Sequence, residues 1–120
     1  MNPNKEIDNH KYKVYSSKIK FCTKESILFY DPEEIIYGKA EQNYTCLYIT
    51  DGNKLLLSKN IGVLEEKLAP HGFFRISRSA LINLRYLKYI DRQQKICFLE
   101  TDRQYRLKTS GNRIRELELY

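Results

Sequence analysis

The feature of this chain that most restricts its fold is a series of short runs rich in aromatic and β-branched residues, each bounded by a turn. In the clearest case, the alternating segment Tyr44–Ile49 is followed by Asp51-Gly52-Asn53 and then by Leu55-Leu56-Leu57. A period of two places successive side chains on opposite faces of a strand, and a Gly turn suits an antiparallel connection. This stretch therefore predicts a β-hairpin.

Further strands are predicted on both sides of this hairpin. Residues 19–21 and 27–30 flank the polar Thr23-Lys24-Glu25 and indicate a second hairpin. Asp31-Pro32-Glu33-Glu34 predicts one helical turn before a strand that begins at Ile35. The remaining extended segments are predicted at 73–76, 81–84, 86–90, 95–99 and 105–107.

Two helices interrupt the strand pattern. In the first, apolar residues recur at helical spacing, Ser58 is the expected N-cap, and Ala69-Pro70-His71-Gly72 ends about three turns. The residues on its apolar face are Ile61, Leu64 and Leu68. A short C-terminal helix is expected after Ser110-Gly111-Asn112. The fold class is therefore mainly β, with antiparallel sheets, and lacks the strand and helix alternation of a parallel nucleotide-binding sheet.

The length of 120 residues predicts one compact domain. Residues 1–17 are polar and aperiodic and are expected to form a leader, with the folded domain at 18–120. The N-terminus has no hydrophobic signal region, and no apolar run is long enough to span a membrane. A soluble cytoplasmic protein without a membrane partner is therefore expected.

The residues that usually carry chemistry are scarce. Cys22, Cys46 and Cys97 form no CxxC pair and have apolar neighbours, so reduced thiols that act as small apolar residues in strands are expected. Phosphate-binding glycine loops and hydrolase motifs are absent, and the pair Glu65-Glu66 fits a solvated helix surface. The sequence thus supports neither an enzyme nor a cofactor or metal site.

The basic residues are concentrated in one part of the chain. The formal net charge is +6, and every Arg lies at or after Arg75. Residues 71–115 carry eleven Lys and Arg against three acids, a net charge of +8. Arg confined to one segment points to phosphate or guanine contacts, because the guanidinium group can bind either with two parallel hydrogen bonds.

Within that basic segment, residues 72–83 contain two arginines three positions apart, with two serines close to them. Arg75 and Arg78, presented with Ser77 and Ser79 on a strand or turn, would make a phosphate-contacting surface. The alternative is that these arginines are solvated or paired with the Glu65-Glu66 acids. Composition alone leaves both interpretations open.

The order of these segments resembles the LytTR DNA-binding domain of bacterial transcription regulators. "IIYGKAEQNY" at 35–44 and "FFRISRSALIN" at 73–83 are similar to that family's "IxYIEAxGNY" and "FxRxHRSxxVN" signatures. The resemblance covers about residues 19–119. It implies an elongated β-sandwich that binds double-stranded DNA through loops placed in successive major grooves. It also implies direct repeats in promoters, with two protomers side by side on the DNA.

The resemblance also assigns residues. Arg78 falls at the family's base-reading position, and Arg75 and Ser79 are expected to contact the DNA backbone. The other two family loops map to Asn43, Tyr44 and Thr45, and to Lys108, Thr109 and Ser110. Here Gly38-Lys39 replaces an apolar-Glu pair, Ser77 replaces His, and Lys108-Thr109 replaces the terminal "SR", so Lys108 or Arg113 is expected to supply the missing charge.

Some residues of the two signatures have a structural interpretation. Phe73, Phe74, Leu81 and Ile82 are expected in the core, and Asn83 is expected to bond a turn backbone.

Other functions remain open. The altered terminal loop also permits a protein-interaction module that has lost DNA binding, whereas RNA binding is disfavoured because the aromatics lack the RRM spacing. Only about 17 residues precede the first strand. The chain is therefore expected to be either a free-standing regulator, controlled by its abundance or a separate partner, or the C-terminal part of a longer protein.

Overall fold

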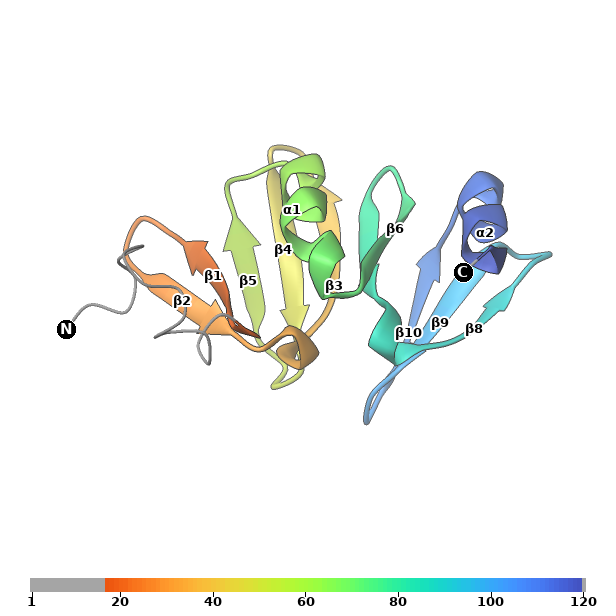
Figure 1. Ribbon diagram of the computed structural model, residues 1–120, viewed down its shortest axis with the longest axis horizontal. Helices are drawn as coiled ribbons and strands as arrows, with labels where there is room; N and C mark the ends of the chain where they lie inside the picture. Colours follow the sequence, from red (N-terminus) through yellow and green to blue (C-terminus); the bar gives the residue numbers. More distant parts are fainter. Residues whose placement is uncertain (1–16, 120) are drawn as a thin grey trace. The chain divides into compact units, whose positions relative to one another are not determined.

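The computed structural model describes residues 17–119, and the contacts within it divide the chain into two units, at 1–32 and 33–120. In the first unit, β1 (Ile19–Cys22) and β2 (Ile27–Tyr30) form an antiparallel hairpin (Figure 1). The Thr23 N–H donates to the Ser26 carbonyl at 2.8 Å and closes the turn. The predicted hairpin is confirmed, as is the helical turn, which is a 3₁₀ turn at Pro32–Glu34.

The second unit contains a five-stranded antiparallel sheet in the order β5-β4-β3-β7-β6. Its strands are β3 (Ile35–Glu41), β4 (Tyr44–Ile49), β5 (Lys54–Leu57), β6 (Phe73–Ser77) and β7 (Ala80–Asn83). The hairpin of β4 and β5 is the one that the sequence predicts most clearly. Its turn places Gly52 at φ 93°, a left-handed conformation that costs least for a residue without Cβ.

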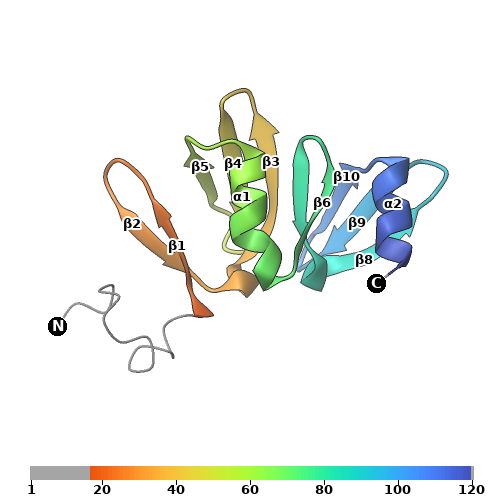
Figure 2. The same cartoon turned by 45° about the horizontal axis from the view of Figure 1, so that its top comes forward.

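The helix α1 (Ile61–Leu68) lies on one face of this sheet and contacts β3, β6 and β7 (Figure 2). Its three predicted apolar residues are buried. The predicted end at Ala69–Gly72 is confirmed, but the predicted cap was wrong. Asn60 is the N-cap, because its side chain accepts the Val63 N–H at 2.9 Å, and Ser58 lies two residues outside the helix. After eight residues the helix passes into a 3₁₀ turn at Ala69–His71.

A three-stranded antiparallel sheet in the order β10-β9-β8 completes the strands of the second unit. Its strands are β8 (Leu87–Asp91), β9 (Ile96–Glu100) and β10 (Gln104–Lys108), at the positions predicted to within two residues. The predicted terminal helix is α2 (Gly111–Glu118). The Ser110 side chain caps it by accepting the Arg113 N–H at 3.3 Å.

One core of the second unit lies between the two sheets. The five-stranded sheet contributes Ile36, Tyr37, Phe74, Ile76, Ala80 and Ile82, and the three-stranded sheet contributes Cys97, Leu99 and Leu107. At its border the rings of Tyr37 and Tyr48 stack with centroids 4.2 Å apart. Burial, aided by the Tyr48 hydroxyl, raises the pKa of Tyr37 far above its ordinary value.

The fold class is therefore as predicted: mainly antiparallel β with two short helices. The core positions predicted within 73–82, namely Phe73, Phe74, Leu81 and Ile82, are all buried. Neither helix between residues 17 and 119 is long and apolar enough to cross a membrane. The predicted leader lies almost entirely outside the described residues, and the domain limits of 1–17 and 18–120 remain a prediction.

The three cysteines lie in strands, as predicted, but their exposure differs. Cys46 and Cys97 are buried, and burial raises the pKa of both thiols, whereas Cys22 is exposed. Because the thiolate is the reactive form, we expect a maleimide to modify only Cys22 in the native protein and all three residues after denaturation. Mass spectrometry of the labelled protein measures this. Native labelling at Cys97 would contradict the packing described between the sheets.

Candidate nucleic-acid interface

Three loops of the second unit that the sequence singled out lie along one edge. The β6–β7 turn reaches β3 beside the β3–β4 turn, because the Ala40 N–H donates to the Ser79 carbonyl at 2.8 Å. The β10–α2 loop joins β6, the strand that leads into this turn, because the Ser110 N–H donates to the Ile76 carbonyl at 2.9 Å. We call the edge formed by residues 42–43, 78–79 and 108–110 the loop edge.

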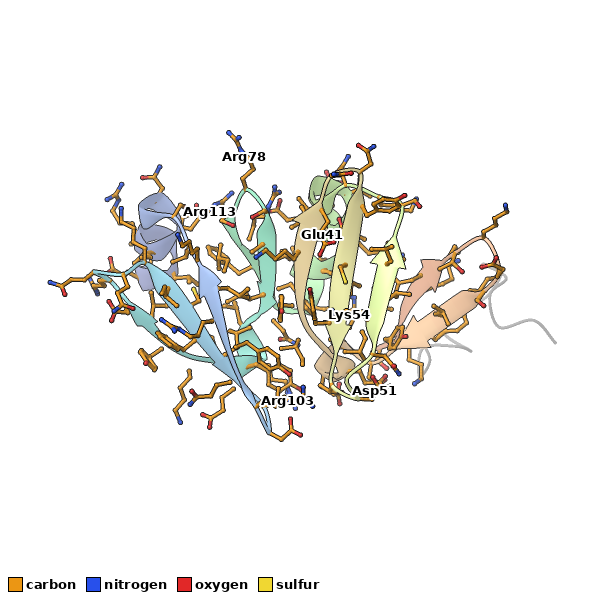
Figure 3. The ribbon with its side chains drawn as sticks, turned by 180° about the vertical axis from the view of Figure 1, so that it is seen from behind. Glu41, Asp51, Lys54, Arg78, Arg103 and Arg113 are labelled. Carbon is orange, nitrogen blue, oxygen red and sulfur yellow. The ribbon has the colours of Figure 1, made fainter. Side chains whose placement is uncertain are left out.

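Figure 3 shows the loop edge with Arg78 and Glu41, and the opposite edge with Asp51 and Arg103. The Arg78 side chain points away from the ribbon. It is exposed, and its guanidinium group forms no hydrogen bond or ion pair with any residue from 17 to 119. This group is therefore free to bind a ligand from solvent.

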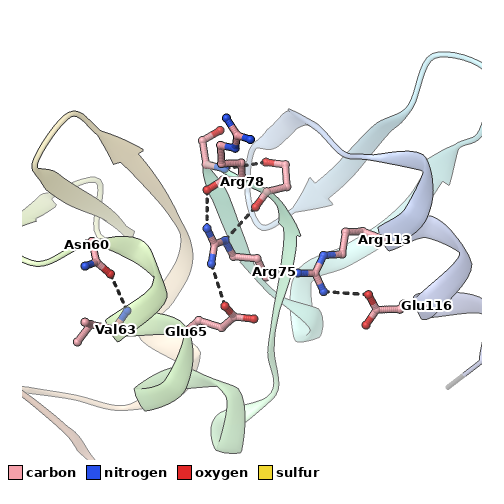
Figure 4. Close-up of polar contacts among 9 residues, drawn as sticks. Asn60, Val63, Glu65, Arg75, Arg78, Arg113 and Glu116 are labelled. Atoms are coloured by element: carbon pink, nitrogen blue, oxygen red, sulfur yellow. Dashed lines mark hydrogen bonds and ion pairs between the residues drawn. The ribbon is translucent and has the colours of Figure 1, made fainter.

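The turn that carries Arg78 is held by polar contacts from both sides of it. Arg75 donates through Nε to the Ser77 carbonyl at 2.9 Å and through Nη2 to the Arg78 carbonyl at 2.6 Å (Figure 4). Its Nη1 lies 2.8 Å from Oε1 of Glu65 on α1. The Ser79 N–H donates to Oγ of Ser77 at 3.2 Å. Of the two interpretations of Arg75, the structure shows the pairing with Glu65.

Two predicted contact residues are removed from the candidate site by their burial. Thr45 is 0% exposed, and its hydroxyl donates to the Lys59 carbonyl at 2.8 Å. Thr109 is 6% exposed, and its hydroxyl donates to the Ile76 carbonyl at 2.8 Å. Both side chains hold neighbouring segments together and present no surface to a partner. The structure gives both hydroxyl groups a structural role, and their assignment as DNA contacts stays a prediction that this burial disfavours.

The other predicted residues of the first loop are accessible. Asn43 and Tyr44 are exposed, next to Gln42, which adopts φ 57° in the tight β3–β4 turn. At the β10–α2 loop, Lys108 is exposed and Ser110 is half-buried. Oγ of Ser110 accepts the Arg113 N–H, and a hydroxyl group that accepts one hydrogen bond can also donate its own hydrogen.

Arg113 lies on the first turns of α2 and is only partly available. Its Nη1 is 2.9 Å from Oε1 of Glu116, and the guanidinium carbon lies 5.9 Å from the Phe74 ring centroid. An exposed pair of this kind contributes little stability and exchanges readily. Arg113 can therefore turn toward an anion at modest cost.

Two lysines beside the loop edge are absent from the residues predicted for the site. Lys59 precedes the α1 cap and is tied to β4 through its carbonyl, and it is exposed. Lys95 accepts the Thr109 N–H on its carbonyl at 2.9 Å, and its Nζ lies 3.8 Å from where a Cβ on Gly111 would sit. Neither lysine belongs to a sequence motif. Their position beside this edge follows only from hydrogen bonds between segments that are distant in the sequence.

Asn83, the last residue of the second signature, is buried and bonds backbone, as predicted. Its Nδ2 donates to the Ile35 carbonyl at 2.9 Å, and its Oδ1 accepts the Arg85 N–H at 3.0 Å. It thereby joins the end of β7 to the start of β3 and caps the 3₁₀ turn at Leu84–Tyr86. Its role is to hold the sheet in which the loop edge is built.

Comparison with known sequences gives two matches. A family model for the LytTr DNA-binding domain matches residues 25–120. The Sensory transduction protein LytT of Bacillus subtilis (strain 168) is 32% identical over 73 residues. That match covers 61% of this chain and 30% of LytT, so the chain spans less than a third of that relative.

Comparison with solved structures gives a match to a LytTr DNA-binding domain from Bacillus cereus. The TM-score is 0.67 at 17% sequence identity, and the match covers 86% of this chain and 94% of the other. At this identity the likeness concerns the fold. It agrees with the arrangement of strands and helices derived above.

Proposed function

Because the chain belongs to the LytTR family of DNA-binding domains, we propose that it binds duplex DNA sequence-specifically through the loop edge, within a bacterial transcription regulator. The observation that carries this proposal is the exposed Arg78, whose guanidinium group pairs with no residue from 17 to 119, on a turn held by Arg75. A guanidinium group offers two parallel N–H donors that match O6 and N7 of guanine in the major groove. Arg78 is accordingly the base reader, and guanine is the base it reads.

Charge on and near the loop edge supports the phosphate contacts. Lys108 is exposed there, Lys59 and Lys95 flank it, and Arg113 can join them by releasing Glu116. Ser79 adds a half-exposed hydroxyl group beside Arg78. Cations and hydroxyl groups in such positions bind phosphate oxygens and set the register of a protein on the duplex.

The shape of the loop edge supports binding by loops and not by a recognition helix. The exposed Arg78 lies on a two-stranded turn, and a major groove about 12 Å wide admits a two-stranded β-ribbon. We place the β6–β7 turn in one major groove, with Asn43 and Tyr44, or Lys108 and Ser110, at the neighbouring groove. We further propose that two adjacent protomers bind direct repeats in a promoter.

Selection of bound duplexes from a random library tests this function. Binding to the selected site and to random duplex is then compared by gel shift across a salt series. We expect tight binding to the selected site and weaker binding to random duplex, both of which decrease with salt. A protein that enriches no sequence and shows no salt-dependent binding would instead act as a protein-interaction module, and the proposal would be wrong.

Lys108→Ala distinguishes a phosphate contact from base reading. Removing one phosphate contact should weaken binding to selected and random duplex alike and reduce the slope of log K against log salt by about 0.9. Lys54→Ala is the matched control, because Lys54 is an exposed lysine that follows the turn at the opposite edge. Equal slopes for wild type and Lys108→Ala would exclude Lys108 from the interface.

A further inference from the structure

Arg75 makes more contacts within the protein than a side chain that binds phosphate would need. Its three guanidinium nitrogens are each engaged, with the Ser77 carbonyl, the Arg78 carbonyl and the Glu65 carboxylate (Figure 4). The side chain is only 16% exposed. We propose that Arg75 is a positioning residue that orients Arg78 for base reading and that it does not itself contact DNA. This inference rests on the proposed function.

The two carbonyls that Arg75 holds are those on either side of Arg78. The Ser77 carbonyl belongs to the peptide plane before the Arg78 Cα, and the Arg78 carbonyl belongs to the plane after it. Fixing these two planes fixes φ and ψ of Arg78 and hence the direction of its Cα–Cβ bond. The exposed reader is thereby oriented before any DNA arrives, which reduces the conformational entropy lost on binding.

Glu65 anchors the other end of this arrangement. Its carboxylate lies on α1, ten residues before Arg75, and is itself about one-third exposed. A guanidinium group held by a carboxylate cannot rotate away from the turn without breaking a charge-assisted hydrogen bond. The orientation of Arg78 is thus coupled to α1, which is far from it in sequence and packed on the sheet.

Lysine cannot replace arginine in this role. An ammonium group donates from a single nitrogen, whereas the planar fork reaches three acceptors in three directions. Arg75→Lys therefore keeps the charge and removes the geometry. Glu65→Gln keeps the shape of the anchor and removes its charge, and Glu66→Gln, at the exposed neighbouring position, is the matched control.

The test measures affinity for the selected and random duplexes across a salt series. Arg75→Lys and Glu65→Gln should weaken binding to the selected site by about 3- to 30-fold and leave random-duplex affinity and the salt slope unchanged. The double variant Arg75→Lys/Arg78→Ala should bind no more weakly than Arg78→Ala, because Arg75 acts only through Arg78. Glu66→Gln should match wild type.

A direct phosphate contact by Arg75 predicts the opposite result. Arg75→Ala would then reduce the salt slope by about 0.9 and weaken both duplexes, and its effect would add to that of Arg78→Ala. Either finding, or wild-type affinity in Arg75→Lys, would overturn the inference. Thermal unfolding of each variant verifies that the fold is retained.

A second readout needs no DNA and separates this inference from the proposed function. Backbone ¹⁵N order parameters of residues 77–79 in the free protein should fall in Arg75→Lys and Glu65→Gln and stay unchanged in Glu66→Gln. If the wild type binds no duplex, the proposed function fails, but this measurement still tests whether Arg75 holds the turn that carries Arg78. Unchanged order parameters in Arg75→Lys would disprove the positioning role in either case.

Discussion

Replacing Arg78 with Ala should weaken binding to the selected DNA site by about 1 to 3 kcal/mol, or about 5- to 150-fold. The guanidinium group is exposed, and its removal breaks no hydrogen bond or ion pair within residues 17–119, so the fold should be unaffected. The loss should fall on one base pair: the variant should no longer distinguish guanine at the position that Arg78 reads. Gel shifts on a panel of single-base variants of the site measure both effects.

Arg103→Ala is the matched control for this experiment. Arg103 is also an exposed arginine in a β-turn, but it lies at the opposite edge of the second unit (Figure 3). Both variants lose one positive charge, so a general electrostatic effect would appear in both. If Arg78→Ala kept wild-type affinity and base preference, or if Arg103→Ala changed them equally, Arg78 could not be the base reader.

Replacing Asn83 with Ala should destabilise the fold by about 1 to 3 kcal/mol without changing what the protein binds. Asn83 is 3% exposed, and the change removes the Nδ2 donor from the Ile35 carbonyl, leaving a buried acceptor without it. The Arg85 N–H also loses its cap. Thermal unfolding should show a midpoint lowered by about 4 to 8 °C for each kcal/mol.

Two further variants define the cause of that loss. Asn83→Asp keeps the acceptor for Arg85 but turns a carboxylate oxygen toward the Ile35 carbonyl, so it should destabilise at least as much as Ala. Asn112→Ala, at an exposed position of α2, should leave stability nearly unchanged. Well below the unfolding midpoint, Asn83→Ala should bind the selected site as wild type does. Selective loss of DNA affinity in a fully folded Asn83→Ala would show a direct contact instead.

The strands could be predicted because their signal is local. Alternation in Tyr44–Ile49 and the Gly turn after it depend on neighbouring residues, as does the cap Ser110 before α2. The cap of α1 was misplaced at Ser58 because Ser and Asn are both good caps, and only the Asn60 hydrogen bond to Val63 distinguishes them. The helices and strands could therefore be predicted from local propensity, whereas the residue at which α1 begins could be determined only from the structure.

The candidate site was less predictable because exposure is a property of the whole fold. The family resemblance maps Thr45 and Thr109 to DNA-facing loops, yet each donates its hydroxyl to a carbonyl of a distant segment and is buried. Gly38 is a further example. A Cβ at this position would lie 2.8 Å from Cδ2 of Leu47, and this close approach follows only from the register of β3 and β4. Arg78 could be proposed from its motif, whereas the contacts by which Arg75 holds the turn are visible only in the three-dimensional structure.

The carbonyl of Ile76 accepts both the Thr109 hydroxyl and the Ser110 N–H, while the Ser79 carbonyl accepts the Ala40 N–H. These hydrogen bonds connect the three loops of the edge to one another through β3 and β6. Adding one base pair between two contacted positions moves the second by about 3.4 Å and rotates it by about a tenth of a turn. Loops connected in this way cannot follow that shift independently, so under the proposed function the distance between the contacted bases becomes part of what the protein recognises.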